Sequence, residues 1–334
     1  MAIIERSALY SQTEATLANE NLELEHTNCA VCGSDNVDIV ATGADYLHKT
    51  SRQIYTFARC RECSHIYLNN RPCLSEIARL YPSDYGTYTK KFARPESIFS
   101  KVKDSVLMGR FRSVTAGMPK DFRLLDVGCG DTRFLMAIRR IFPEANLSGL
   151  DWHFGPEIEK EAQHLNISTI TGSIETANLP HNHYDVITMN QLIEHVWDVD
   201  IVLSRCYDSL KSGGMLSIET PNPDGWDRIF FKSGGWGGYY WPRHLNLFSS
   251  ANLSQVVERA GFKVVSRQNL LAPPCWIYSI QFSAQRFGLG KWVNKVFADN
   301  NVAFLAAFAV IDGIAKLFGA TTSNQKLIAV KVSN

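Results

Sequence analysis

The 334-residue chain is predicted to be an α/β protein, in which a small β module and a helical cap precede a mainly parallel sheet covered by helices. Two observations predict this class. From Asp121 the chain repeats a pattern of strand, glycine turn, helix and strand, as in a parallel sheet. Near its start it carries two CxxC motifs, which indicate a metal-binding module. The 45% hydrophobic and 20% charged residues exclude a disordered chain.

The charge is balanced overall but unevenly distributed. A formal net charge of +1 argues against an obligate nucleic-acid binder. Residues 1–48 hold one basic and eight acidic side chains, whereas residues 49–123 hold fifteen basic and six acidic ones. This basic segment is either a solvated face or a surface that attracts an anionic substrate or a membrane. No secretory signal and no apolar run of about 20 residues is found, so a cytoplasmic protein without a membrane span is expected.

The two cysteine pairs predict a zinc site. Cys29 and Cys32 form the first pair, and Cys60 and Cys63 form the second, with 27 residues between the pairs. Two such turns complete a tetrahedral all-cysteine shell, which leaves no position for a catalytic water. Strand-like runs at 37–42 and 53–58 lie between the pairs, and the pattern resembles a zinc ribbon. Unligated thiols or a redox CxxC are the alternatives.

The glycine turn after the first strand of the sheet predicts a cofactor site. The stretch from Phe122 reads as a strand ending in Asp-Val-Gly-Cys-Gly, with glycines at 128 and 130. A dinucleotide fingerprint needs a third glycine at 133, where Arg133 stands, and this argues against NAD.

Further elements are expected as helices at 132–141 and 253–260, and as strands at 146–150, 168–171, 184–190, 210–222, 263–268 and 326–331.

These motifs together resemble the class I S-adenosylmethionine (SAM)-dependent methyltransferases, whose first motif is an acid followed by GxGxG. Thr132 stands in place of the third glycine of that motif. With the cysteine pairs, the chain resembles bacterial methyltransferases of glycan and natural-product metabolism that carry an N-terminal zinc module. The resemblance implies a Rossmann-like seven-stranded sheet and SAM as cofactor. It implies cofactor contacts by Asp126, Gly128, Cys129, Gly130, Asp151, Trp152, Ser173, Ile174, Asn190 and Gln191.

Two segments after the fourth and fifth strands are expected to form the acceptor site. In a doubly wound sheet, ligands bind beyond the carboxyl ends of the strands. The long segment 221–248 combines aromatic residues with glycines and is expected to be a lid, or else a surface loop packed by its own aromatics. His244 is the favoured general base and His195 the second candidate, with a structural role as the alternative for each. The expected substrate-binding residues are Arg243, Trp241, Tyr240 and Glu194.

The expected domain boundaries follow from these motifs. Residues 1–73 form the zinc-ribbon-like module, 74–120 the helical cap or linker, and 121–334 the SAM-binding domain with the lid 221–248 and a helical insertion at 269–325. The apolar run 302–318 within the insertion is expected as a buried helix or a helix over the active site, with a membrane-surface helix as the alternative.

The expected function is SAM-dependent methyl transfer to a small molecule, such as a sugar nucleotide, a glycan or a natural-product intermediate. The acceptor could be anionic, and its nucleophilic atom stays open because one fold serves many acceptors. Alternatives are a methyltransferase acting on RNA or protein, and a non-catalytic zinc-ribbon protein that binds nucleic acid or a partner. Peripheral membrane contact and the oligomeric state are left open.

Overall fold

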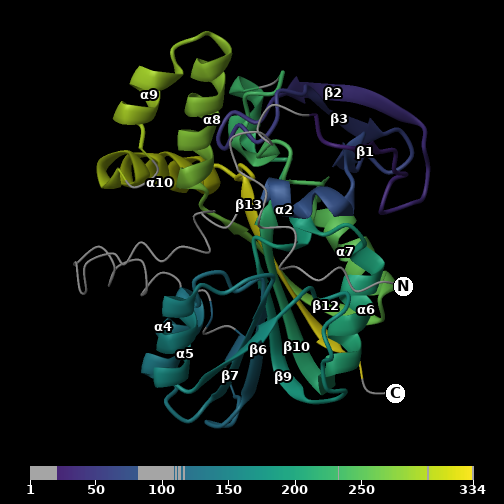
Figure 1. Ribbon diagram of the computed structural model, residues 1–334, viewed down its shortest axis with the longest axis vertical. Coiled ribbons are helices and arrows are strands. Elements are labelled where there is room, and N and C mark those ends of the chain that lie inside the picture. The colour runs from purple at the N-terminus through teal and green to yellow at the C-terminus, as the bar shows by residue number, and fades with distance from the viewer. Residues whose placement is uncertain are drawn as a thin grey trace. The chain divides into compact units, whose positions relative to one another are not determined.

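The computed structural model describes residues 21–81, 109, 111, 114–115, 117–231, 233–298 and 301–332 (Figure 1). The helical cap expected at 74–120 falls mostly outside these residues. Within them, its beginning consists of the short helices η2 (Leu74–Glu76) and α2 (Ile77–Leu80). The rest of that expectation stays a prediction.

The chain forms two compact units, and each is built from separate stretches of sequence. The first unit takes the described parts of Met1–Ser83 together with Pro221–Ser249 and Leu270–Asn324. The second takes those of Asp84–Thr220, Ser250–Asn269 and Gln325–Asn334. The expected lid and helical insertion therefore cluster with the N-terminal module, whereas the sequence placed them in the cofactor domain. The reason is packing, because their aromatic residues find their partners in the first unit.

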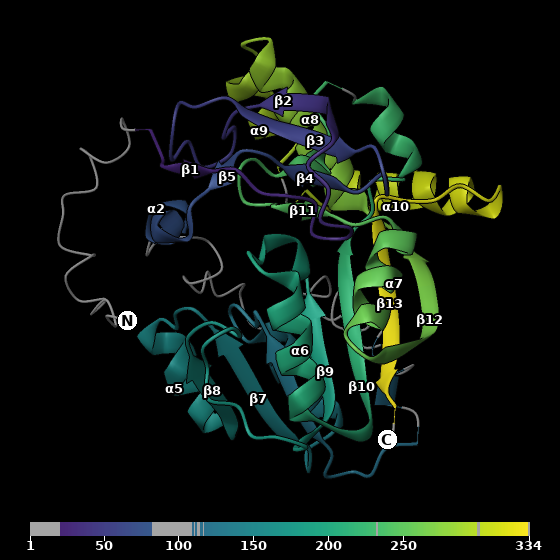
Figure 2. The same ribbon diagram turned by 90° about the vertical axis from the view of Figure 1, so that its right-hand side faces the viewer.

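The second unit contains a seven-stranded sheet in the order β12-β13-β10-β9-β6-β7-β8. The pairs β10–β9, β9–β6, β6–β7 and β7–β8 are parallel. Figure 2 shows β13 running opposite to its neighbour β10. The sheet is therefore mainly parallel, as the sequence predicted. The strands are β6 (Arg123–Val127), β7 (Asn146–Asp151), β8 (Ile167–Thr171), β9 (Tyr184–Asn190), β10 (Leu210–Pro221), β12 (Phe262–Leu270) and β13 (Asn324–Lys331).

Helices join these strands because apolar side chains recur at helical spacing. In α4, Leu135 and Ile138 are fully buried and belong to the same core cluster as Leu124 of β6 and Leu147 of β7. Short connections between strand and helix leave the turns at the carboxyl ends of the strands open to ligands. The helices are α4 (Arg133–Ile141), α5 (Pro156–His164), η3 (Ile193–His195), α6 (Val199–Ser209) and α7 (Ser250–Arg259).

The first unit contains a four-stranded antiparallel sheet in the order β11-β4-β3-β2. Three of its strands come from the cysteine-rich module, and the fourth comes from the segment expected as a lid. Asn246 of β11 pairs with Tyr67 of β4, so residues 179 positions apart lie on adjacent strands. The strands are β2 (Val37–Gly43), β3 (Tyr55–Cys60), β4 (Ile66–Leu68) and β11 (Asn246–Leu247); β1 (Leu24–Glu25) pairs separately with β5 (Arg71–Pro72).

Aromatic side chains of 221–249 pack on this sheet. The Trp241 ring lies 4.8 Å from that of Phe57 in β3. A Cβ atom on Gly43 of β2 would come within 2.4 Å of the Trp241 ring, so only glycine fits there. Trp236, Tyr239 and Trp241 are almost fully buried. The segment is therefore part of the core of the first unit rather than a loosely held lid. It includes η4 (Trp226–Phe230) and η5 (Gly237–Tyr239).

Among its described residues the first unit also contains the helices α8 (Pro273–Arg286), α9 (Gly290–Val296) and α10 (Val302–Leu317). Helix α8 contacts η5, α9 and α10. The expectation of a buried helix at 302–318 is wrong, because Asp312 is the buried residue of α10 while many of its apolar side chains are exposed. In the part of the chain that is described, no helix has both the length and the apolar character that crossing a bilayer requires.

Candidate functional site

The four cysteines predicted as metal ligands lie together in the first unit. Their sulfur atoms all lie within 4.8 Å of one another, and the Sγ atoms of Cys29 and Cys63 are 3.4 Å apart, as are those of Cys32 and Cys60. A zinc ion held tetrahedrally at about 2.3 Å from each sulfur requires sulfurs roughly 3.8 Å apart. The donor set and its spacing therefore fit zinc.

The two CxxC turns have the same backbone design. The amide of Gly33 donates to the carbonyl of Cys29 at 2.8 Å, and the amide of Ser64 donates to that of Cys60 at 2.9 Å. Gly33 and Ser64 both adopt positive φ, at 78° and 61°. The sequence indicated the turn at Gly33, but a serine in the equivalent place gave no signal.

The chemistry of the Cys29 thiol also fits a metal site. Burial raises the pKa of Cys29 to about 11, so the thiol does not ionise at neutral pH without a compensating charge. A divalent cation supplies that charge and favours the thiolates. Of the remaining cysteines, Cys129 and Cys206 are buried, and Cys73 and Cys275 are half-buried.

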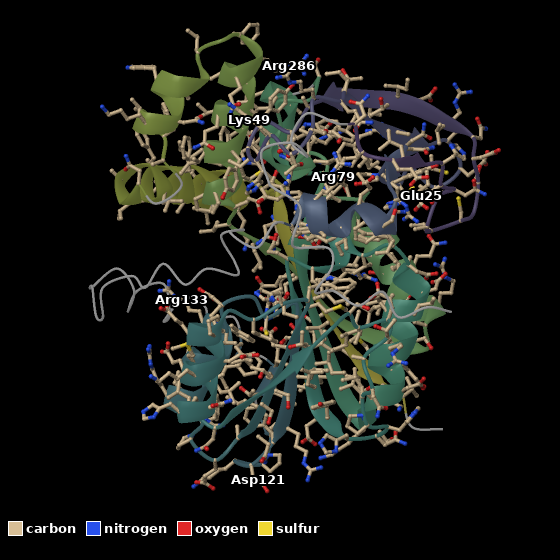
Figure 3. The ribbon with its side chains drawn as sticks, viewed as in Figure 1. Glu25, Lys49, Arg79, Asp121, Arg133 and Arg286 are labelled. Atoms are coloured by element: carbon tan, nitrogen blue, oxygen red, sulfur yellow. The ribbon has the colours of Figure 1, made fainter. Side chains whose placement is uncertain are left out.

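The glycine loop of the second unit lies at the carboxyl end of β6. Gly128 and Gly130 have φ values of 72° and 54°, where a side chain would be strained. A Cβ atom at Gly128 would lie 2.7 Å from Cδ1 of Leu192. Figure 3 shows Arg133 at the end of α4 that follows this loop, and Asp121 at the opposite end of the sheet. The loop, whose two glycines are half-buried, thus lies where ligands bind in such sheets.

Asp151 at the end of β7 supports the loop. Its Oδ2 accepts from the amide of Gly130 at 2.7 Å, and its Oδ1 accepts from the amide of Trp152 at 2.7 Å. Burial raises its pKa, and these amide hydrogen bonds oppose the rise. Each carboxylate oxygen has two lone pairs, so Asp151 retains acceptor capacity for hydroxyl groups of a ligand.

Asp126 lies under the loop on β6 and is fully buried. Burial raises its pKa to about 7, while hydrogen bonds from Thr188 and Asn190 oppose the rise. The Thr188 hydroxyl donates to Oδ1 at 2.6 Å, and the Asn190 amide donates to the same oxygen at 3.2 Å. The predicted residues Asp126 and Asn190 are thus brought together, and they are joined by Thr188, which the sequence analysis did not single out.

The other predicted cofactor residues lie around the same ends of the strands. Cys129 is buried against Gly149 of β7, where a Cβ atom would approach its sulfur to 2.6 Å. Ser173 and Ile174 follow β8 and are buried, with the Ser173 hydroxyl 3.0 Å from that of Thr176. Gln191 is exposed and has a φ of 55°. The loop residues and strand ends thus share one edge of the sheet.

Glu194 and His195 occupy η3, directly after β9 in the second unit. Glu194 is fully buried, and burial raises its pKa to about 8. The Thr220 hydroxyl donates to its Oε2 at 2.8 Å. A carboxyl with this pKa is largely protonated at neutral pH and can donate a hydrogen bond. His195 is half-buried.

The other residues predicted for the acceptor lie in the first unit. His244 is buried, its Nδ1 lies 2.7 Å from the carbonyl of Gly238, and burial lowers its pKa to about 4. Tyr240 is half-buried, with its hydroxyl 3.1 Å from Nε2 of His48. Trp241 donates from Nε1 to the carbonyl of Gly234. These contacts are internal to the first unit.

Arg243 makes a buried ion pair that the sequence did not reveal. Its Nη1 lies 3.1 Å from Oδ2 of Asp45, and both side chains are completely buried. Its Nε donates to the carbonyl of Leu80 at 3.0 Å, and Asp45 also accepts from the amides of His48 and Thr50. An arginine committed to these contacts positions the segment after η5, whereas the sequence suggested a substrate-binding role. No local pattern could have paired residues 198 positions apart.

Comparisons with known proteins agree with this geometry. The sequence matches the family described as "Methyltransferase domain" over residues 73–267. It is 30% identical over 141 residues to a probable S-adenosylmethionine-dependent methyltransferase of Mycolicibacterium smegmatis, covering 42% of this chain and 52% of that protein. It is 35% identical over 120 residues to a demethylmenaquinone methyltransferase of Listeria welshimeri, covering 33% of this chain and 51% of that protein.

A solved structure shows the same fold. It is phosphoethanolamine N-methyltransferase 2 of Haemonchus contortus in complex with S-adenosyl-L-methionine, with a TM-score of 0.50 and 15% identity, covering 89% of this chain and 69% of that one. The matches to the two curated relatives span only about half the length of each. The family match covers more than half of this chain and contains the glycine loop. The chain therefore belongs to the methyltransferase-domain family.

Proposed function

We propose that this chain transfers a methyl group from SAM to a small-molecule acceptor. The observation that carries the proposal is the glycine loop of the second unit, with Gly128 and Gly130 at positive φ between the buried acids Asp126 and Asp151. The family match and the names of the relatives, which include SAM-dependent enzymes, support it.

In this proposal the loop backbone receives the amino-acid portion of SAM, and Asp151 accepts hydrogen bonds from the ribose hydroxyls. Trp152 follows Asp151, while Ser173 and Ile174 after β8 border the adenine. Asp126 supports the loop from below through its contacts with Thr188 and Asn190. The four cysteines hold a structural zinc ion in the first unit and take no part in the reaction.

When bound, SAM supplies an activated methyl group on a sulfonium, which is already an excellent leaving group. The protein therefore contributes mainly alignment and exclusion of water. A hydroxyl or acidic carbon acceptor also needs a base. Burial lowers the pKa of His244 to about 4, which leaves the imidazole neutral at pH 7 but makes it a weaker base than an exposed histidine. We assign the base to His244, with His195 as the second candidate, and we assign acceptor contacts to Glu194 and Tyr240.

The proposed acceptors are sugar nucleotides, glycans and natural-product intermediates. The names of two groups of relatives, demethylmenaquinone methyltransferase and ubiquinone biosynthesis O-methyltransferase, add quinone precursors to the candidates. A panel of these acceptors with SAM labelled in its methyl group tests the small-molecule class. Label that enters only RNA or protein would replace it with the macromolecular alternative.

Titration of the zinc-replete protein with S-adenosylhomocysteine tests the cofactor assignment. We expect binding of one equivalent, and loss of about tenfold or more in affinity in Gly128→Ala, since the new Cβ atom meets Leu192 in a strained backbone. Gly213→Ala is the matched control, because Gly213 has a φ of 75° but open space around it. Absence of binding by the unmodified protein, or equal affinities in both variants, would contradict the proposal.

A further inference from the structure

The hydroxyl of Tyr240 contacts a histidine of the cysteine-rich module. Its oxygen lies 3.1 Å from Nε2 of His48, a residue 192 positions earlier in the chain that no sequence motif singled out. The two rings meet edge to face, with centroids 6.0 Å apart and planes at 76°. Tyr240 also packs against a second imidazole, that of His244, at a centroid distance of 5.1 Å. All three residues belong to the first unit, so the cluster is internal to one compact body.

A buried carboxylate places His48. Oδ1 of Asp45 accepts from the amide of His48 at 2.9 Å, and its Oδ2 accepts from the amide and the hydroxyl of Thr50 at 2.9 and 2.7 Å. The same Oδ2 lies 3.1 Å from Nη1 of Arg243, which closely follows Tyr240 in the chain. One carboxylate therefore fixes both the turn that carries His48 and the segment that carries Tyr240. The contact between the two rings follows from this common anchor.

The backbone of Tyr240 is held in an unusual conformation. Its φ of 33° and ψ of 55° lie in the left-handed region, which large side chains rarely adopt. Its neighbours Tyr239 and Trp241 are almost fully buried, whereas Tyr240 is half-buried. A tyrosine that only filled the core would need neither the strained backbone nor a partly open position. Strain of this kind is retained where the direction of a side chain matters for function.

The hydrogen bonds around Tyr240 decide where the hydrogens lie. Nδ1 of His244 is 2.7 Å from the carbonyl oxygen of Gly238, which can only accept, so Nδ1 carries the hydrogen and the lone pair of the neutral ring is on Nε2. In the contact between Tyr240 and His48, the phenol is a stronger acid than a neutral imidazole. The hydroxyl of Tyr240 therefore donates to Nε2 of His48. The oxygen of Tyr240 keeps its lone pairs for a further donor.

We propose that His48 is a positioning residue of the acceptor site and that it sets the direction of the Tyr240 hydroxyl. The inference rests on the proposed function, in which Tyr240 contacts the acceptor. With its hydrogen held by His48, the Tyr240 oxygen accepts a hydrogen bond from the acceptor, so the pair recognises an acceptor that carries a hydroxyl group. The pair itself forms and breaks no covalent bond. The cysteine-rich module thereby contributes to recognition of the acceptor, in addition to holding the four cysteines.

Nitrogen NMR of the full zinc-replete chain, labelled with ¹⁵N in its histidines, tests the pair. His48→Gln identifies the resonances of His48 by their loss. We expect the Nε2 resonance of His48 to shift downfield in Tyr240→Phe, because this variant removes only the hydroxyl that donates to it. A role of Tyr240 in packing alone would not produce the shift, since the ring is retained. An unchanged Nε2 resonance would overturn the proposal.

Methyl transfer to the acceptor panel tests the consequence for the reaction. His48→Leu and Tyr240→Phe should each lower kcat by about tenfold or more and leave the affinity for S-adenosylhomocysteine unchanged, since a misdirected hydroxyl weakens alignment of the acceptor. His48→Gln should retain most of the activity, because its side-chain carbonyl can also accept from the hydroxyl. The double variant of His48→Leu with Tyr240→Phe should be no slower than either single variant, since both remove the same contact.

The matched control is His26→Leu, because His26 lies in the same module but has its Nδ1 3.3 Å from Oδ1 of Asn70. It should transfer methyl groups as the unmodified protein does. Equal turnover in His48→Leu and the unmodified protein, with intact binding of S-adenosylhomocysteine, would overturn this inference alone. Absence of that binding in the unmodified protein would contradict the proposed function instead, and the NMR shift would still decide whether the pair of His48 and Tyr240 exists.

Discussion

Asp45 in the first unit and Asp126 in the second are both buried, yet their pKa values move in opposite directions. Burial raises the pKa of each, because an ionised carboxylate loses water. At Asp45 the charge of Arg243 and the hydrogen bonds from Thr50 and His48 outweigh burial, and the pKa is lowered. This carboxylate is therefore ionised and connects distant parts of the first unit.

At Asp126 the hydrogen-bond donors are the neutral side chains of Thr188 and Asn190, and burial raises the pKa to about 7. The carboxyl lies beneath the glycine loop, where a ligand is expected, and it retains a proton in part of the neutral range. At these two positions the environments differ in one respect: Asp45 has a buried cationic partner that connects distant segments, whereas Asp126 has neutral hydrogen-bond donors and stays titratable beneath the glycine loop.

The largest expected effect comes from the cysteine cluster. Cys60→Ser should remove one of four ligands and reduce zinc from about one equivalent to a small fraction, because a structural zinc site needs its complete shell. Hydrogen exchange in β2 and β3 should rise strongly. Cys73→Ser is the control, since Cys73 lies outside the cluster. Full zinc content in Cys60→Ser, measured by mass spectrometry of the metal, would exclude the four-cysteine site.

The second expected effect is the loss of stability when the buried ion pair of Arg243 and Asp45 is broken. Arg243→Met should lower the free energy of unfolding by about 3–5 kcal/mol, because Asp45 is left as an uncompensated buried charge. Urea denaturation followed by hydrogen exchange in the first unit measures the loss. The double variant with Asp45→Asn should recover part of it. If the double variant is as unstable as the single one, the charge is not the cause.

The third prediction distinguishes Asp126 from Asp45 by how the free energy of unfolding depends on pH. The folded-state pKa of Asp126 is raised from 3.8 to about 7, so its stabilising contribution is complete below pH about 4 and is lost as the pH rises towards 7. The lowered pKa of Asp45 has the opposite sign, with stability present above pH about 4 and lost in acid.

Unfolding in urea from about pH 2 to pH 8 tests this difference, because Asp45 acts in acid and Asp126 towards neutral pH. Asp126→Asn should remove a slope of up to about 1.4 kcal/mol per pH unit between pH 4 and 7. Asp45→Asn should leave that slope in place and reduce acid sensitivity instead. Parallel pH profiles for Asp126→Asn and the unmodified protein would show that Asp126 does not titrate in this range.

The smallest effect on stability is expected at an exposed arginine–aspartate ion pair, which has the same chemistry as the buried one. Arg259 of α7 lies 2.6 Å from Asp200 of α6, with 38% and 62% of the two side chains exposed. Arg259→Ala should change the free energy of unfolding by about 1 kcal/mol or less, since water screens the pair. A loss as large as that in Arg243→Met would mean that burial does not decide the strength of these pairs.

Sequence periodicity predicted the parallel sheet well, because each element depends on residues close to one another. The strand expected at 184–190 is β9 (Tyr184–Asn190), and the helix expected at 132–141 is α4 (Arg133–Ile141). The convergence of the four cysteines was also predictable from two short motifs. The short strands β4 and β11 were missed, since β11 has two residues and exists through its partner.

The local spacing of cysteines, glycines and apolar residues was enough to predict the cysteine cluster, the glycine loop and the succession of strands and helices along the sheet domain. Only the tertiary structure decided that Trp241 and Arg243 belong to the interior of the first unit, and that α10 turns an apolar face outward. The physical reason is the distance along the sequence between the residues that interact. A turn or a helix face is encoded within a few residues, whereas the Asp45–Arg243 pair and the choice of which side of α10 is covered depend on segments that meet only after the chain has packed.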